Sequence, residues 1–184
     1  MGEIASPEQL RMSFVRRALF VVPLVLLLGI ASGRLANSGY GNPWFAALAK
    51  PGFTPPGWVF AVAWTILYIA MGFALAIVLN ARRAPGRGVA VGVFLFQLAL
   101  NLAWSPLFFA AHRVSTALAL ILVILALTAL AIPLFWRIRA TAGLLLLPYF
   151  FWLCFAALLN FQIDRMNPDA ERLAPGAGGA QIRL

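Results

Sequence analysis

Acidic residues are scarce in this sequence, and the shortage limits its chemistry. The 184-residue chain contains five Asp and Glu residues, and none lies between Glu8 and Asp164. Proton pumps and many transporters depend on carboxylates within their membrane spans, and acid/base catalysis by paired carboxylates needs two acids close together. The only histidine, His112, has no acid available to orient it, as a hydrolytic triad would require. The sequence therefore argues against carboxylate-based transport and against hydrolysis.

Cysteine is nearly absent as well. Cys154 is the only one, so no internal disulfide can form. One cysteine and one histidine cannot supply the clusters that hold structural zinc, so no metal site is predicted. Cys154 lies within a long apolar run, and we expect a buried structural thiol rather than an exposed, reactive one. No motif in the sequence requires a cofactor.

Charged residues make up only 10% of the sequence, whereas apolar residues make up 63% and the mean hydropathy is +0.93. A soluble domain is normally about half apolar and about a quarter charged. Five apolar stretches reach the ~20 residues that a helix needs to cross the hydrocarbon core. The predicted spans are residues 14–36, 58–79, 89–111, 114–136 and 141–162. Short links favour antiparallel neighbours, so we predict an all-α, multi-pass integral membrane protein with a five-helix transmembrane bundle.

The remaining segments divide the chain into one membrane domain with two flanking pieces. Residues 1–13 are predicted to be an N-terminal extension, residues 14–167 the membrane domain, and residues 168–184 a disordered C-terminal tail. The first apolar segment resembles a signal peptide in its flanks, but it is long enough to span, and we expect it to be retained. The loop 35–57 is long and rich in Gly, Pro and aromatic residues, which is more typical of a functional loop than of a simple connection.

The formal net charge of +9 suggests a nucleic-acid partner at first sight. The basic residues, however, lie one to three per loop around apolar spans rather than on one soluble face, so no nucleic acid is expected. Eight of the 14 Lys and Arg residues lie on the side of the N-terminus, and six lie on the side of the long loop. The positive-inside rule then places the N-terminus in the cytoplasm. One Lys among 14 basic residues, together with abundant Ala, favours a bacterial membrane.

Tryptophan is concentrated in one half of the predicted bundle. From the helical rise, Trp64 lies about 9 Å, Trp104 about 10 Å and Trp152 about 15 Å below the long-loop surface. Asn101 and Gln97 share a face of the third span and would be unfavourable if they pointed into lipid. An apolar aromatic cavity with a few amides under a loop suits a flat hydrophobic ligand. Interfacial belts and helix packing also use tryptophan, and spacing alone leaves both interpretations open.

The predicted ligand-contacting side chains come from the long loop and from the second, third and fifth spans. They are Trp44, Phe53, Trp58, Trp64, Tyr68, Gln97, Asn101, Trp104, Tyr149, Trp152 and Phe155. For Trp44 and Trp58, loop packing or an interfacial position is an equal alternative. His112 lies at the same end of the bundle and is considered as an axial haem ligand, although a loop histidine beside Arg113 is more often a solvated interface residue.

Three runs of sequence resemble the TspO/MBR family of tryptophan-rich sensory and translocator proteins. Residues 44–68 resemble the family's first loop and second helix, residues 97–109 its third helix, and residues 148–160 its fifth helix. The three motifs occur in the family's order and at its separations, which makes the resemblance specific.

The resemblance implies a five-helix bundle that is usually a homodimer. It also implies binding of tetrapyrroles such as protoporphyrin IX and haem, of sterols, and of synthetic isoquinoline-type ligands, with membrane lipids as further partners. In bacterial relatives, the pair matching Trp64 and Trp152 is implicated in light-dependent degradation of porphyrin. Two classes of function therefore stay open: a sensor or transporter that binds porphyrin without chemistry, and a slow photo-oxidative enzyme that uses Trp64 and Trp152 as catalytic residues. The lack of acid/base and metal groups slightly favours the first.

Two departures from the family pattern bear on the ligand. Phe53 stands where many relatives have tryptophan, which keeps a stacking surface but removes the indole donor. The sterol motif expects Tyr followed by a basic residue, whereas this chain has Phe161 before Arg165. Such sterol motifs are weak patterns even when intact. We therefore favour tetrapyrrole over sterol.

Overall fold

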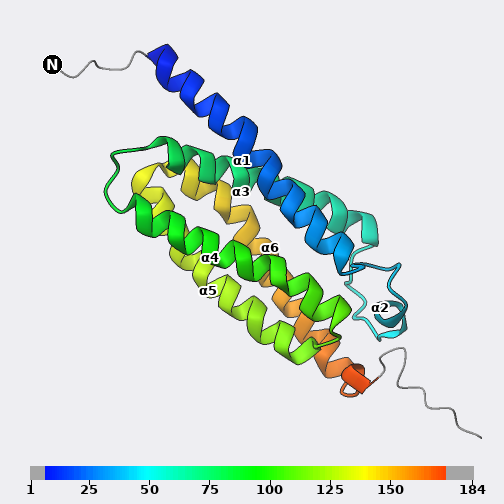
Figure 1. The fold of residues 1–184 in the computed structure, drawn as a ribbon. Helices are drawn as coiled ribbons and strands as arrows, with labels where there is room; N and C mark the ends of the chain where they lie inside the picture. The colour runs from blue at the N-terminus through cyan, green and yellow to red at the C-terminus, as the bar shows by residue number, and fades with distance from the viewer. Residues whose placement is uncertain (1–6, 173–184) are drawn as a thin grey trace, which may run out of the picture.

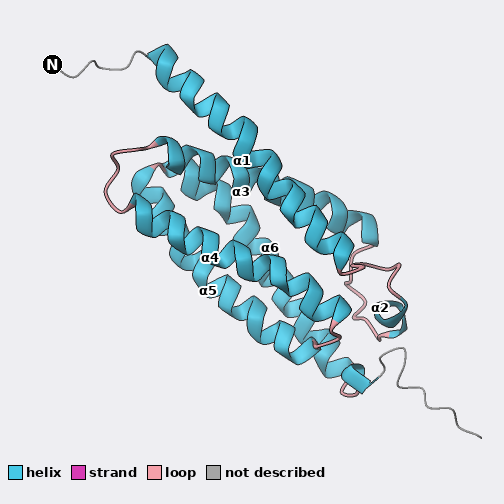
Figure 2. Cartoon of the chain, in the orientation of Figure 1, coloured by secondary structure: helices cyan, strands magenta, loops and turns pink. Residues whose placement is uncertain are grey.

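Helices make up all the regular structure in residues 7–172, the part of the chain that the computed structural model describes (Figure 2). The main elements are α1 (Pro7–Leu35), α2 (Pro43–Ala47), α3 (Gly57–Asn80), α4 (Arg87–Ser105), α5 (Val114–Ile138) and α6 (Ala140–Met166). A π-helical turn, Pro106–Ala110, follows α4, and a 3₁₀ turn, Ala170–Arg172, follows α6. Five of these helices, α1, α3, α4, α5 and α6, are long and apolar enough to cross a membrane. The predicted five-helix membrane fold is confirmed.

The helices run up and down, with neighbours in sequence lying side by side (Figure 1). α1 packs along α3, α5 lies between α4 and α6, and α3 also contacts α6. The first turns of α1 extend beyond the other helices (Figure 1). The first loop, with α2 inside it, lies at the same end of the bundle as the C-terminal end of α6 (Figure 1). This end contains the aromatic residues that the sequence placed together.

The start of the membrane domain differs from the predicted boundary. The first helix begins at Pro7, so half of the predicted extension 1–13 belongs to α1. The predicted span was limited to the continuous run of apolar residues. The helix itself continues toward the N-terminus, past Arg11, where the sequence is no longer apolar. Proline at the first position of a helix is favourable, because its missing N–H would have no helical partner there.

The predicted disordered tail is wrong for its first residues. Ala170–Arg172 forms a 3₁₀ turn, and Ala170 is 2% exposed. The turn is held because the Trp44 indole Nε1 donates a hydrogen bond of 2.9 Å to the Ala170 carbonyl. The composition of the tail could not reveal this contact, because Trp44 lies far from Ala170 in the sequence. Residues 173–184 of the predicted tail lie outside the described residues.

Cys154 is exposed on the surface of α6, contrary to the expectation of a buried thiol. Its neighbour Leu153 faces the core, as does Ala157 one turn further along α6. Successive residues on a helix point about 100° apart, so Cys154 faces away from the bundle. α6 is apolar around its whole circumference, and the sequence therefore did not reveal which face is internal.

The contact between α1 and α3 depends on a close approach at Gly72. A Cβ atom at this position would lie 2.8 Å from the Val22 Cα atom and 3.2 Å from Val22 Cγ2. Small residues at such points let helix backbones pack closely, and membrane helices associate largely through this packing. Gly72 thus sets the distance at which α1 lies along α3.

We expect Gly72→Ala to destabilise the protein by about 1–3 kcal/mol, because the added methyl must push α1 away from α3. Gly52 provides a matched control, since a Cβ atom there would meet nothing within 4 Å. Gly52→Ala should change stability by less than about 0.5 kcal/mol. Thermal unfolding of the three proteins in detergent measures the difference. Equal unfolding temperatures would contradict the close contact.

Candidate functional site

The first loop contains its own short helix, which Asn42 starts and anchors. The Asn42 side-chain oxygen accepts a hydrogen bond from the Phe45 N–H at 3.2 Å, which caps the first turn of α2. The same side chain donates through Nδ2 to the Phe109 carbonyl at 3.0 Å. Pro43 occupies the first helical position. Asn42 therefore fixes both the shape of α2 and its position against the end of α4.

Two further contacts tie the loop to the end of α6. The Trp44 indole bonds to the Ala170 carbonyl, as described above. The Asn167 side chain accepts from the Ala49 N–H at 2.8 Å and donates to the Ala49 carbonyl at 2.9 Å. The Asn167 side-chain amide thus bonds to both the N–H and the carbonyl of Ala49, as the backbone of a neighbouring β-strand would. The loop is thus held over the bundle by its own Trp44 side chain and by Asn167 at the end of α6.

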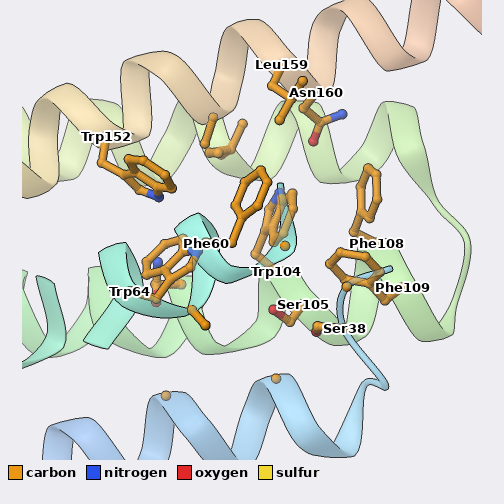
Figure 3. A pocket seen from close by; sticks show the side chains of 18 of the residues that line it. Ser38, Phe60, Trp64, Trp104, Ser105, Phe108, Phe109, Trp152, Leu159 and Asn160 are labelled. Carbon is orange, nitrogen blue, oxygen red and sulfur yellow. The ribbon is translucent and has the colours of Figure 1, made fainter. Parts of the chain in front are cut away.

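Beneath this loop lies a cavity of about 450 Å³ (Figure 3). Its wall comes from all five long helices and from the first loop. The lining is mostly apolar, and Arg34 is its one charged residue among the residues described. A volume of this size falls within the range of pockets that bind small ligands.

Trp64 of α3 and Trp152 of α6 lie next to each other in the cavity wall (Figure 3). Their ring centroids are 6.4 Å apart and the ring planes meet at 83°. Trp64 also stacks on Tyr68, with centroids 5.3 Å apart and an angle of 27° between the planes. Phe60 lies edge-on to Trp152 at 5.8 Å. These rings form an apolar wall with both flat faces and edges available.

The π-helical turn after α4 builds the neighbouring part of the wall. Pro106 opens the turn, and its carbonyl accepts from the Ala111 N–H at 2.9 Å, a bond between residues five apart. Such wide turns are rare and occur often at functional sites. Phe108 and Phe109, which are consecutive, both line the cavity. Trp104 stacks on Phe108 at 5.0 Å, and its indole donates to the Ala117 carbonyl at 3.1 Å.

The predicted polar residues form two separate pairs. The Tyr68 hydroxyl donates to Asn101 Oδ1 at 2.9 Å, and both residues line the cavity. The Tyr149 hydroxyl donates to Gln97 Oε1 at 3.0 Å, and both are fully buried in the core and absent from the lining. Each pair links two helices without leaving a polar group against lipid. The first pair therefore borders the candidate site, whereas the second stabilises the bundle below it.

Two buried polar atoms in the cavity wall have no hydrogen-bond partner within the described residues. They are the Trp152 indole nitrogen, a donor, and the Asn160 amide oxygen, an acceptor. The Asn160 amide nitrogen donates to the Val114 carbonyl at 3.1 Å, which leaves the oxygen on the other side of the group. Buried polar groups usually have hydrogen-bond partners. A water or a bound molecule would therefore be most favourable if it placed an acceptor at the Trp152 nitrogen or a donor at the Asn160 oxygen.

The structure brings five of the predicted site residues to the cavity and places the others elsewhere. The lining includes Trp64, Tyr68, Asn101, Trp104 and Trp152, and it omits Trp44, Phe53, Trp58, Gln97, Tyr149 and Phe155. Trp44 is buried in packing contacts, while Trp58 is 69% exposed on the outside of α3. The Phe53 and Phe155 rings lie 6.3 Å apart in an edge contact. Contact of any of these residues with a ligand stays a prediction.

His112 also lies outside the cavity lining. Its ring stands 4.4 Å from the Trp44 ring at an angle of 30°, and its φ angle of 56° belongs to the left-handed region. The backbone turn between the π-helical segment and α5 therefore directs the imidazole toward α2. This position gives no support to the axial haem ligand considered from the sequence.

Several lining residues were not predicted, and those of α1 are the most informative. Gly29, Gly33 and Arg34 share one face of α1 and line the cavity. α1 has no tryptophan, so the aromatic criterion could not find it. The two glycines four residues apart were a signal of close approach, and the ring of Tyr68 indeed occupies the space where a Gly29 Cβ atom would lie. Asn160 was visible as an amide within a span but was not assigned to the site.

The fold and the cavity define a class of protein: a multi-pass integral membrane protein with an internal aromatic cavity beneath its first loop. The family model described as the TspO/MBR family matches residues 21–166, and the chain belongs to this family. It is 42% identical over 155 residues to the tryptophan-rich protein TspO of Chlorobaculum tepidum, covering 80% of this chain and 98% of that protein.

Two further relatives are similar over most of their length. The chain is 38% identical over 133 residues to the tryptophan-rich sensory protein of Cereibacter sphaeroides, covering 71% of this chain and 82% of the relative. It is 35% identical over 142 residues to the human translocator protein, covering 76% of this chain and 84% of that protein. These matches confirm the family that the three motifs indicated.

The Tyr149–Gln97 hydrogen bond is buried outside the cavity lining, so its loss should affect the stability of the protein without changing the cavity wall. Tyr149→Phe leaves the buried Gln97 side chain without its donor, which should cost about 1–3 kcal/mol. Tyr40→Phe is the control, because the Tyr40 hydroxyl donates to the Pro55 carbonyl in an exposed position where water can replace it. Thermal unfolding should show a clear loss for Tyr149→Phe alone. If both variants unfold like the original protein, the buried pair contributes nothing to stability.

Proposed function

We propose that the protein is a membrane receptor or sensor that binds flat hydrophobic ligands, chiefly tetrapyrroles such as protoporphyrin IX and haem, and regulates or transports them. Membership of the TspO/MBR family supports a sensor or translocator role in a membrane, because relatives are named tryptophan-rich sensory protein and translocator protein. The ligand class rests on the resemblance together with the cavity, and it needs no acid, base or metal from the chain.

The observation that carries this proposal is the position of three indoles in one cavity wall. Trp64, Trp104 and Trp152 come from three different helices and all line the same space beneath the first loop. Planar aromatic ligands gain from stacked and edge contacts with such rings, at about 0.5–1.5 kcal/mol for each pair beyond simple burial. The surrounding lining is apolar, which favours a molecule with a large hydrophobic surface.

A second candidate function is light-dependent oxidative degradation of the bound porphyrin. The specific observation in its favour is the Trp64–Trp152 pair, whose rings are in edge contact at 6.4 Å and both line the cavity. An excited porphyrin bound against this pair would lie beside two oxidisable side chains, with dissolved oxygen as the oxidant. In this role both tryptophans would be catalytic residues.

Sterol binding is the third candidate, and the structure adds little to it. Phe161 and Arg165, at the positions of the sterol motif, lie outside the cavity lining. Phe161 is exposed on α6, with the Arg165 guanidinium 5.8 Å from its ring. A sterol recognised by these residues would therefore bind to the lipid-facing surface of α6 rather than in the aromatic cavity.

We further propose that two copies of the chain associate through α4. Gly88, Gly92, Ala99 and Ala103 are exposed on this helix, and a Cβ atom at either glycine would meet nothing within 4 Å. Small exposed residues allow a second helix to approach closely in a membrane. The family resemblance favours a homodimer.

Titration of the purified protein with protoporphyrin IX in detergent tests the main proposal. Quenching of tryptophan fluorescence should saturate, and Trp64→Phe and Trp152→Phe should each weaken affinity about fivefold, the equivalent of about 1 kcal/mol of lost ring contact. Trp58→Phe is the matched control, because Trp58 is exposed and outside the lining. An absence of saturable quenching would overturn the ligand assignment.

Illumination of the same samples separates the first two candidate functions. A porphyrin spectrum that stays constant in the light would support binding without chemistry and exclude degradation of this ligand. Bleaching that disappears in Trp64→Phe and Trp152→Phe, but not in Trp58→Phe, would support the enzyme. Bleaching that is equal in all four proteins would show photochemistry of the porphyrin alone.

A further inference from the structure

One charged side chain borders an otherwise apolar cavity. Arg34 lies in the last turn of α1, one residue before the helix ends, and it is exposed at the loop end of the bundle. Ser38 and Tyr40, from the loop that follows, line the same part of the cavity. A long basic side chain at this level extends its guanidinium toward water while its stem covers apolar surface. The positive charge therefore stands at the rim of the cavity rather than inside it.

The Arg34 guanidinium has no hydrogen-bond or ion-pair partner among the described residues, whereas the Arg113 and Lys50 side chains at this end do. Arg113 pairs with Glu171 at 3.1 Å. Lys50 donates to the carbonyls of Ala46 and Leu48, and its ammonium lies 4.7 Å from the Phe45 ring. Partial burial lowers the pKa of Lys50 below its usual value. The Arg113 and Lys50 side chains therefore already have partners within the protein, whereas the Arg34 guanidinium is available to a ligand.

The described carboxylates at this end of the bundle are engaged elsewhere. Asp169 pairs with Arg172 and Glu171 with Arg113, while Asp164 accepts a hydrogen bond of 2.7 Å from the Ser115 hydroxyl. No acid occurs in the sequence between Glu8 and Asp164, the stretch that forms most of the cavity wall. An anion that pairs with Arg34 at the rim must therefore come from outside this part of the chain.

We infer that the cavity selects an apolar ligand that bears a carboxylate, with the anion held by Arg34 at the rim. This inference rests on the proposed function and narrows its ligand class. Protoporphyrin IX has two propionate groups on one edge and apolar vinyl groups on another, so the molecule can enter with its apolar edge first. Trp64 lies seven residues into α3, about 10 Å from the start of the helix, where the macrocycle would stack. Neutral sterols have no group for Arg34.

The test compares protoporphyrin IX with its dimethyl ester, which keeps the macrocycle and removes both negative charges. Both are titrated into the full-length protein in nanodiscs of zwitterionic phospholipid, so that anionic lipids do not compete for Arg34. The variants are Arg34→Gln, Arg34→Lys and, as a matched control, Arg165→Gln, which removes a cation from the same end but outside the lining. The measured quantity is the ratio of acid affinity to ester affinity for each protein. The two porphyrins partition into lipid to different extents, but this difference is the same for every protein. It therefore cancels when the ratio for a variant is divided by the ratio for the original protein.

We expect the ratio to fall about fivefold in Arg34→Gln, the size of an accessible ion pair, while ester affinity stays constant. Arg34→Lys should keep most of the preference for the acid, and Arg165→Gln should keep all of it. In the original protein, added salt should weaken binding of the acid but not of the ester, because salt screens exposed charges. The unchanged ester affinity also shows that Arg34→Gln is folded.

Two results would overturn the inference, and they have different consequences. If both porphyrins bind and the ratio is the same in Arg34→Gln as in the original protein, the carboxylate is not recognised by Arg34, but the proposed function stands. If neither porphyrin binds to any of the proteins, the proposed function fails and this inference fails with it. A ratio that falls equally in Arg165→Gln would also contradict it, because the effect would then reflect general surface charge.

Discussion

The absence of water in the hydrocarbon core is the constraint on which this structure depends. A polar group there gains most from a partner within the protein, so the backbone is helical and most polar side chains pair across helices. The interhelical bonds run from Ser32 to the Leu102 carbonyl, from Tyr68 to Asn101, from Tyr149 to Gln97, from Trp104 to the Ala117 carbonyl and from Asn160 to the Val114 carbonyl. Several of these residues also form the cavity wall. The bonds that make polar side chains tolerable in lipid therefore also fix the shape of the candidate site.

The same constraint explains why the site is built from rings rather than from ionisable groups. A charge in the interior would need a counter-charge and good hydrogen bonds, and the sequence has no acid between Glu8 and Asp164 to provide them. Aromatic rings give contact area and geometric preference without that requirement. Polar groups without a partner in the protein occur at a few places along the cavity: the Trp152 indole nitrogen, the Asn160 amide oxygen and the Arg34 guanidinium. In an apolar pocket, the positions of a few polar groups determine which ligands can bind.

The sequence could predict the parts of this protein that depend on local patterns. The span of α3 was placed to within one residue at each end, since long apolar runs follow from bilayer thickness. The meeting of Trp64, Trp104 and Trp152 followed from helical rise and alternating direction. The position of Arg34 at the cavity and the burial of Trp44 could not be predicted, because each depends on which distant segment lies beside it. Cys154 was misplaced for the same reason, as an apolar helix does not reveal its internal face.

The attachment of the first loop to the end of α6 has a kinetic consequence. Residues of this loop form part of the cavity wall, and the loop is held by the Trp44 bond to Ala170 and by the paired Asn167–Ala49 bonds. A molecule that leaves through the loop must wait until these contacts open together. For a ligand of the proposed class, the residence time would then depend on a few hydrogen bonds at the surface and the affinity on the rings below. Different residues would govern the two quantities, so evolution could adjust one without the other.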